Sequence, residues 1–276
     1  MLRLIIAVLA LGLPASAQTT VTNVKYEPAF RFQTGAMKIR KREAFRVAPV
    51  AVGLEHPWGL AILPGGGYLV TERVGRLNHV AADGAVTRIS GLPDVASVGQ
   101  GGLLDVAVAE DFENSRRVYL TLSRAAEGGL ATSAVTAILS ADNRALSDVR
   151  EIFVQKPADK SGSHFGSRIV LDGEFAFVTI GDRGTPDNAQ DLEATIGKVV
   201  RVRRDGSVPQ NNPFIGDDGA LDEIWSYGHR NPQGAALHPN TGELWTLEHG
   251  PRGGDELNRI EKGANYGWPV ITYGIN

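Results

Sequence analysis

Short apolar stretches, bounded by turn residues, recur along this chain. Four units share one pattern, in which an apolar stretch, a turn containing Gly, Asp or Asn, and a second apolar stretch follow one another. They cover residues 58–72, 102–122, 166–180 and 234–247. Their starts lie roughly 43 to 68 residues apart, which is typical of propeller blades once loop insertions are allowed for. Each unit is therefore predicted to be a β-hairpin.

The sequence between these hairpins predicts further strands and no convincing amphipathic helix. Residues 199–203 alternate between apolar and charged side chains and end before the turn at Asp205 and Gly206, as expected of a half-exposed outer strand. Thirty-three Gly and 14 Pro suit a chain that turns often. We expect an all-β fold, a β-propeller with about four visible blades over residues 47–276, and keep a β-sandwich as the alternative.

The first 17 residues have the pattern of a secretory signal peptide. Arg3 precedes an apolar run over residues 4–13, and Ala15 and Ala17 frame a cleavage site of small residues. The run is too short to span a bilayer comfortably; the alternative is a buried N-terminal strand or helix. The mature protein is thus expected to be periplasmic or secreted, with residues 18–46 as a polar leader.

Composition narrows the function classes. Hydrophobic residues make up 42% of the chain and charged residues 21%, which supports a sizeable core. The net charge is −3 with basic residues dispersed, which gives no support for nucleic-acid binding. Cys is absent, so disulfides, zinc–thiolate sites and Cys nucleophiles are excluded. No later stretch is apolar and long enough for a membrane helix.

Chemistry-bearing residues gather next to the third hairpin. His164 precedes its first strand and Asp182 follows its second, so the two ends should lie side by side. A carboxylate that orients an imidazole is what a general base needs. We therefore predict that the two side chains are hydrogen-bonded at the mouth of the propeller channel. The alternative is that His164 caps a strand and Asp182 accepts loop amides.

Two loops offer possible ligand contacts. Arg230 and Asn231 precede a turn stiffened by Pro232 and could grip a planar anion, although Arg230 could equally pair with a neighbouring acid. Gln100 is an amide among glycines and could belong to a plain turn.

A third loop could bind a cation. Residues 248–256 combine Gly and Pro with carboxylates and lead into residues 265–269. Outward carbonyls and carboxylates are the oxygen ligands that calcium prefers, although no helix–loop–helix motif is present.

In chain order, these segments resemble the soluble pyrroloquinoline-quinone (PQQ)-dependent glucose and aldose sugar dehydrogenases, from about His56 to the end of the chain. The matching motifs are residues 56–59, 99–104, 180–184, 196–199 with 205–209, 228–234, 249–256 and 265–269. The resemblance implies a six-bladed propeller in which the quinone lies flat over the central axis. It implies that His164 is the general base with Asp182 as its orienting partner, and that the quinone contacts are Gln100, Arg230 and Asn231.

The same resemblance implies calcium as a second cofactor. The carbonyls of Gly250 and Pro251 would bind a calcium that also touches the quinone, and a separate calcium would lie around Glu256 and Tyr266. The implied reaction oxidises an aldose to a lactone. His164 takes the proton of the anomeric hydroxyl, and hydride passes to the quinone C5. Calcium and Arg230 would stabilise the developing negative oxygen, and a separate acceptor would later take up the electrons.

The chain ends where the resembled family continues for roughly two more blades. We expect a chain cut short at its C-terminus, with apolar faces exposed on its first and last blades and with lower stability and activity than a longer parent. Two other functions stay open. A calcium-dependent lactonase-type hydrolase would share the fold, and a non-catalytic propeller could bind sugars or proteins.

Overall fold

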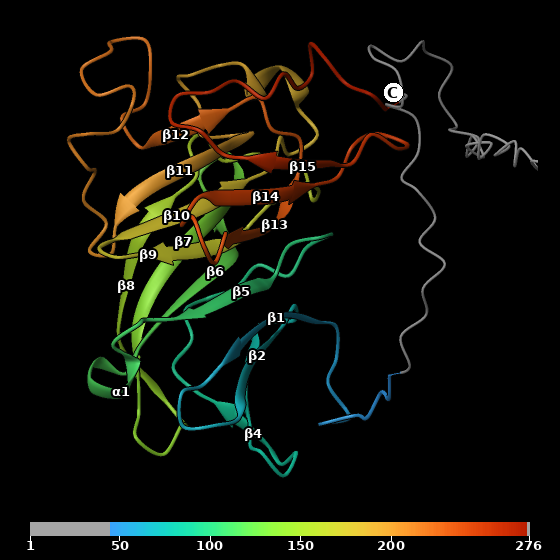
Figure 1. Ribbon diagram of the computed structural model, residues 1–276, viewed down its shortest axis with the longest axis vertical. Helices are drawn as coiled ribbons and strands as arrows, with labels where there is room; N and C mark the ends of the chain where they lie inside the picture. Colours follow the sequence, from blue (N-terminus) through green and yellow to red (C-terminus); the bar gives the residue numbers. More distant parts are fainter. Residues whose placement is uncertain (1–44, 275–276) are drawn as a thin grey trace, which may run out of the picture. The chain divides into compact units, whose positions relative to one another are not determined.

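The computed structural model describes residues 45–274, so the predicted signal segment and nearly all of the predicted leader lie outside the described residues. The chain divides into two units, residues 1–46 and 47–276. Within the second unit, four antiparallel sheets follow one another in sequence order (Figure 1). Among the residues with assigned structure, no helix has the length and apolar character needed to cross a membrane.

Each sheet is a meander whose strands are neighbours in sequence. The first sheet contains β1 (Pro57–Ile62), β2 (Tyr68–Glu72), β3 (Arg76–Val80) and β4 (Val86–Ile89). The second contains β5 (Leu103–Val108), β6 (Arg117–Ala126), β7 (Gly129–Leu139) and β8 (Leu146–Val154). The third contains β9 (Ile169–Asp172), β10 (Phe175–Ile180), β11 (Lys198–Arg203) and β12 (Ile224–Tyr227). The fourth contains β13 (Pro232–Leu237), β14 (Leu244–Glu248) and β15 (Glu256–Arg259).

The four predicted hairpins are confirmed as β1–β2, β5–β6, β9–β10 and β13–β14, and residues 199–203 lie in β11. The turn between β9 and β10 works because Gly173 adopts a positive φ of 53°, a conformation that glycine accepts without steric cost. Two short helical turns were not predicted, α1 (Phe112–Ser115) between β5 and β6 and the 3₁₀ turn η1 (Pro186–Ala189) after β10.

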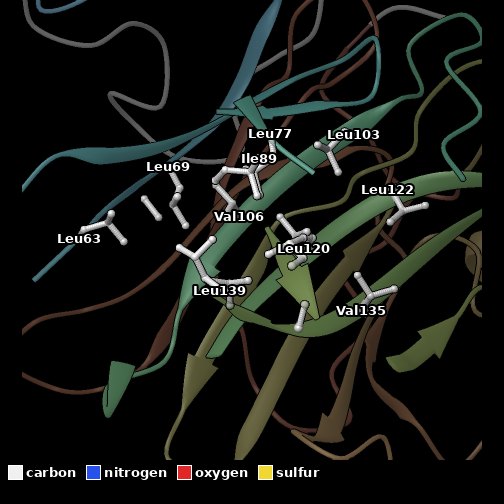
Figure 2. Close-up of a cluster of buried hydrophobic side chains, with 14 of the residues drawn as sticks. Leu63, Leu69, Leu77, Ile89, Leu103, Val106, Leu120, Leu122, Val135 and Leu139 are labelled. Carbon is white, nitrogen blue, oxygen red and sulfur yellow. The ribbon is translucent and has the colours of Figure 1, made fainter. Parts of the chain in front are cut away.

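Three apolar cores lie between successive sheets. The first joins sheets one and two through residues such as Leu69, Leu103 and Leu120 (Figure 2). The second joins sheets two and three, and the third joins sheets three and four. Strand β5 contacts β1 on one side and β9 on the other, and β9 also contacts β13. Sheets that pack face to face in chain order around their first strands form a propeller, so the predicted class is confirmed.

The outer faces of the first and last sheets carry exposed apolar side chains, as predicted. In β1, Leu60 is 56% exposed and Ile62 is 68% exposed, while Ala61 between them is buried. In the last sheet, Leu247 is 57% exposed and Leu257 is 63% exposed. Among the described residues no sheet packs against these two faces. Their outward-pointing apolar side chains are therefore exposed to solvent.

One arginine links the first strands of all four sheets. Arg168, just ahead of β9, donates from Nη1 to Asp105 Oδ1 of β5 at 2.6 Å. Its Nε and Nη2 donate to the backbone oxygen of Gln233 in β13 at 3.1 and 2.9 Å. Its guanidinium carbon lies 4.5 Å from the ring centre of Trp58 in β1. Burial raises the pKa of Asp105, and the Arg168 charge acts against that rise.

We expect Arg168→Met to lower the free energy of unfolding by about 3–5 kcal/mol, because it leaves the buried Asp105 carboxylate without its cation. Adding Asp105→Asn should recover part of this loss. As a matched control, Arg203→Met removes an exposed ion pair with Glu174 and should cost about 0–1 kcal/mol. Urea unfolding of the three variants and the unmodified chain measures these differences, and equal losses at Arg168 and Arg203 would contradict the central role of Arg168.

Candidate active site

The predicted contact between His164 and Asp182 is present. His164 Nδ1 lies 2.6 Å from Asp182 Oδ1, and Asp182 is only 1% exposed. The neutral imidazole therefore carries its proton on Nδ1 and donates it to the carboxylate. Nε2 then keeps its lone pair and has no partner among the described residues, while the side chain is 18% exposed. This is the arrangement of a base that can reach a ligand.

The backbone around this pair is tightly constrained. The prediction that His164 leads directly into an inner strand is wrong, because β9 begins only at Ile169; His164 itself has a positive φ of 49°. A side chain at Gly181 would clash with the carbonyl oxygen of His164, so the two segments approach through a glycine. Such a left-handed conformation at a bulky residue is rare and is held here by the surrounding contacts.

Both oxygens of the Asp182 carboxylate accept hydrogen bonds. Oδ1 also accepts the backbone N–H of Gly184 at 2.8 Å, and Oδ2 accepts the indole N–H of Trp268 at 2.8 Å. The Asp182 N–H donates to the Arg230 carbonyl at 2.7 Å. Trp268 belongs to a motif found in the sequence, but no spacing rule indicated that its indole would reach a residue 86 positions earlier.

The two predicted amide contacts have a defined orientation. Gln100 Oε1 accepts the His164 backbone N–H at 2.8 Å, and Asn231 Oδ1 accepts the Gly166 backbone N–H at 3.1 Å. Because each amide oxygen is occupied by a backbone donor, each NH₂ group points elsewhere. Neither NH₂ group has an acceptor within residues 45–274. The structure thus keeps two amide donors next to His164.

Arg230 adds an unpaired positive charge. Its Nη1 donates to the His249 carbonyl at 3.0 Å, and its guanidinium lies 5.4 Å from the Trp268 ring centre. Its Nε is buried without a partner, and no carboxylate pairs with its side chain in the described part of the chain. The structure therefore does not support the alternative that Arg230 neutralises a neighbouring acid, whereas an anionic ligand would suit it.

A buried hydrogen-bond network holds the backbone of Arg230. Glu248 Oε2 accepts the Arg230 backbone N–H at 2.9 Å, and its Oε1 lies 3.4 Å from His229 Nδ1. His229 Nε2 lies 2.9 Å from Ser226 Oγ, and the His229 ring stacks on Tyr266 with the ring centres 4.7 Å apart. Burial raises the pKa of Glu248, but His229 and three hydrogen bonds outweigh it and leave the pKa below its usual value. His229 and Ser226 are fully buried and cannot contact a ligand. The network therefore holds Arg230 in place and takes no direct part in chemistry.

The residues predicted to bind calcium have mixed surroundings. The Gly250 N–H donates to Asp255 at 2.9 Å, and Pro251 is buried. Glu256 accepts from Asn258 at 3.0 Å, and burial beside Glu248 raises the pKa of Glu256. The Tyr266 hydroxyl donates to the Arg259 carbonyl and accepts the Glu261 N–H. No group of three or more His, Cys, Asp or Glu side chains suited to a metal occurs among the described residues.

Backbone oxygens gather in this loop instead. A side chain at Gly250 would clash with the carbonyl oxygens of Gly253 and Gly254, and one at Gly274 would clash with that of Pro251. Carbonyl oxygens held close together by an irregular loop are ligands of the kind that calcium accepts. The donor set of the loop is therefore compatible with this cation.

Lys198 is a supporting residue that the sequence did not single out. Its Nζ donates to the carbonyl oxygens of Asn188, Ala189 and Ile196 at 2.8, 3.1 and 2.8 Å. These carbonyls belong to the loop that follows Asp182, and the Ala189 oxygen also accepts the Gly228 N–H at 2.9 Å. Burial lowers the pKa of Lys198 to about 7, with Asp191 acting against this shift.

A propeller whose histidine–carboxylate pair lies beside free cationic and amide donors is the class that this fold and site define. The sequence matches the Glucose / Sorbosone dehydrogenase family over residues 54–276. The chain belongs to this family.

Named relatives agree with this assignment. Aldose sugar dehydrogenase YliI of Escherichia coli (strain K12) is 49% identical over 227 residues, which cover 81% of this chain and 61% of that protein. The crystal structure of the soluble aldose sugar dehydrogenase of Escherichia coli in its apo form superposes with a TM-score of 0.79 at 47% identity, covering 81% of this chain and 65% of that one.

The PQQ-bound aldose sugar dehydrogenase of Streptomyces coelicolor superposes with a TM-score of 0.73 at 32% identity, covering 82% of this chain and 66% of that one. The chain thus spans 61% and 60% of the length of the first two curated relatives.

Lys198→Met should change the pH dependence of stability. Between about pH 7 and pH 10 the unfolded lysine keeps a proton that the folded lysine has released, so Lys198 makes the free energy of unfolding rise with pH. The variant should lack this contribution. The free-energy difference between the two proteins, measured by urea unfolding at pH 6, 8 and 9.5, should therefore grow in favour of the unmodified chain.

As a control, the exposed Lys262→Met should leave the pH dependence unchanged. A constant difference between Lys198→Met and the unmodified protein at all three pH values would contradict the depressed pKa of Lys198.

Proposed function

We propose that this protein oxidises the anomeric hydroxyl of an aldose to a lactone, using PQQ and Ca²⁺. The observation that carries this proposal is the free Nε2 of His164 together with the unoccupied amide donors of Gln100 and Asn231 and the Arg230 guanidinium, which no carboxylate neutralises among the described residues. Membership of a sugar dehydrogenase family supports sugar oxidation as the activity.

The donor set fits a planar, anionic quinone. PQQ carries carboxylates and carbonyl oxygens, and the Gln100 and Asn231 amides are fixed with their NH₂ groups as donors. The unpaired Arg230 guanidinium supplies the positive charge that such an anion requires. When bound, PQQ accepts the hydride that leaves the anomeric carbon.

The residues of this chain handle the proton. His164 Nε2 takes the proton of the anomeric hydroxyl, and the imidazolium that forms is stabilised through Nδ1 by Asp182. Asp182 is buried and keeps its donors throughout, so the imidazole ring does not need to reorient. Arg230 stabilises negative charge that develops on the ligand oxygens.

Calcium is proposed for the loop over residues 250–266. The carbonyls of Gly250 and Pro251 would hold an ion at the quinone, and Glu256 with Tyr266 would hold a second one. The crowding of carbonyl oxygens in this loop supports oxygen coordination. Bound at the quinone, the ion would supply Lewis-acid stabilisation of negative oxygen.

We also propose that the protein is exported from the cytoplasm. The pattern of residues 1–17 supports it, and a periplasmic or secreted enzyme would pass its electrons to a separate acceptor.

His164→Ala is expected to lower PQQ-dependent aldose oxidation by about 10²- to 10⁴-fold, because it removes the positioned base. PQQ affinity should change little, since the donors on Gln100, Asn231 and Arg230 remain. Aldose-dependent dye reduction and quinone titration measure the two effects. The matched control is His238→Ala in the turn after β13, where the ring accepts two backbone N–H groups and lies 6.5 Å from the Trp245 ring centre. Near-normal turnover in His164→Ala would sink the assignment of the base.

Chelation should lower the melting temperature, and calcium rather than magnesium should restore it. Magnesium demands a smaller, near-octahedral site and gives up its waters reluctantly. Glu256→Gln should weaken the calcium response, whereas the exposed Glu174→Gln, in the turn before β10, should retain it. Calorimetry with chelator, Ca²⁺ and Mg²⁺ provides the measurement. An unchanged melting temperature on chelation would count against the proposed calcium.

A further inference from the structure

Trp268 contacts both halves of the candidate site. Its indole N–H donates to Asp182 Oδ2 at 2.8 Å, and the guanidinium of Arg230 lies 5.4 Å from its ring centre. The residue is only 7% exposed. One side chain therefore adjoins the carboxylate that orients His164 and the cation proposed to bind the quinone.

The position of the indole is fixed by contacts that do not involve Asp182. The Trp268 backbone N–H donates to the Gly228 carbonyl at 3.0 Å, and its carbonyl accepts Gln190 Nε2 at 2.6 Å. Gln190 also pairs with the Asn265 side chain through two amide hydrogen bonds of 2.7 and 3.0 Å. Because the segment is anchored through its backbone and through Asn265, the indole N–H is held ready for a carboxylate.

Asp182 depends on this donor. Its Oδ1 is shared by His164 and Gly184, but Trp268 is the sole partner of Oδ2 within the described range. A buried carboxylate oxygen without a donor is costly, and water has little access because Asp182 is 1% exposed. Loss of the indole N–H would leave the carboxylate free to rotate away from the His164 ring.

We propose that Trp268 is a positioning residue that sets the His164–Asp182 pair through its N–H and the Arg230 guanidinium through its ring. The proposal rests on the proposed function for its catalytic consequence, but the positioning itself is a property of the cofactor-free protein. Two substitutions separate the roles. Trp268→Phe keeps an aromatic face and removes the N–H, whereas Trp268→Leu removes both.

The chain offers a matched control in Trp245 of β14. Its indole nitrogen is also buried but has no hydrogen-bond partner. Trp245→Phe is the same chemical change without a bond to lose, so it should leave both the site and the activity unchanged.

The first readout is nuclear magnetic resonance of the cofactor-free protein. In the unmodified chain, the Trp268 indole proton should be protected from exchange, as expected for a donor bonded to a buried carboxylate. In Trp268→Phe the His164 Nδ1–H resonance should shift or broaden, and in Trp245→Phe it should not. An unprotected Trp268 indole proton, or an unchanged His164 resonance in Trp268→Phe, would overturn the proposal.

The second readout is kinetic. Trp268→Phe should lower kcat for aldose oxidation by roughly 10- to 100-fold with little change in KM or quinone affinity, since only the base is disturbed. Trp268→Leu should in addition weaken quinone binding by roughly 2- to 5-fold through Arg230. Equal effects of both variants on quinone binding would refute the ring contact as a positioning element.

The two proposals fail in different ways. If His164→Ala retains turnover while the His164 resonance still responds to Trp268→Phe, the assigned base is wrong and the positioning stands. If His164→Ala is inactive but the resonance ignores Trp268→Phe, the base stands and the positioning is refuted.

Discussion

The ion pair between Arg168 and Asp105 is the constraint on which the arrangement of the sheets depends. It joins the first strands of sheets two and three, and the other contacts of Arg168 reach Trp58 in sheet one and the Gln233 backbone in sheet four. Asp105 is buried and Arg168 is only partly exposed, so the buried carboxylate is stable because the guanidinium and the backbone N–H of Ile169 bind it. Because His164 lies four positions before Arg168, the contacts of Arg168 also constrain the segment that carries His164.

The chemistry of the site depends on which side-chain atoms already accept hydrogen bonds from the backbone. Backbone N–H groups occupy the oxygens of Gln100 and Asn231, and Asp182 accepts three donors. What remains available to a ligand is the Nε2 lone pair of His164 together with donors only. Such a surface favours a ligand that is rich in hydrogen-bond acceptors. It also favours a hydroxyl group that can give its proton to Nε2 of His164.

Much of this organisation could be predicted from the sequence. Turn residues between apolar stretches predicted four hairpins, and the two ends of the third predicted the contact between His164 and Asp182. Outside the hairpins only β11 was predicted at specific residues; the positions of β3, β4, β7, β8, β12 and β15 were not, because their apolar and polar side chains alternate too weakly to set their bounds. The roles of Trp268 and Lys198 were also out of reach. A hydrogen bond between residues 86 positions apart arises only when two sheets pack, and the carbonyls around Lys198 converge only once the loop has folded.

The three cores also bear on how this part of the chain can open. Each core is built from side chains of two neighbouring sheets, so a single sheet does not form a complete core by itself. Stability is then a chain of nearest-neighbour couplings, as in stacked repeat proteins. Within residues 45–274, sheets two and three share a core with a neighbour on both faces, while sheets one and four share one on a single face. Within this part of the chain we therefore expect local opening to begin at sheets one and four, and the His164–Asp182 pair, next to sheet three, to open last.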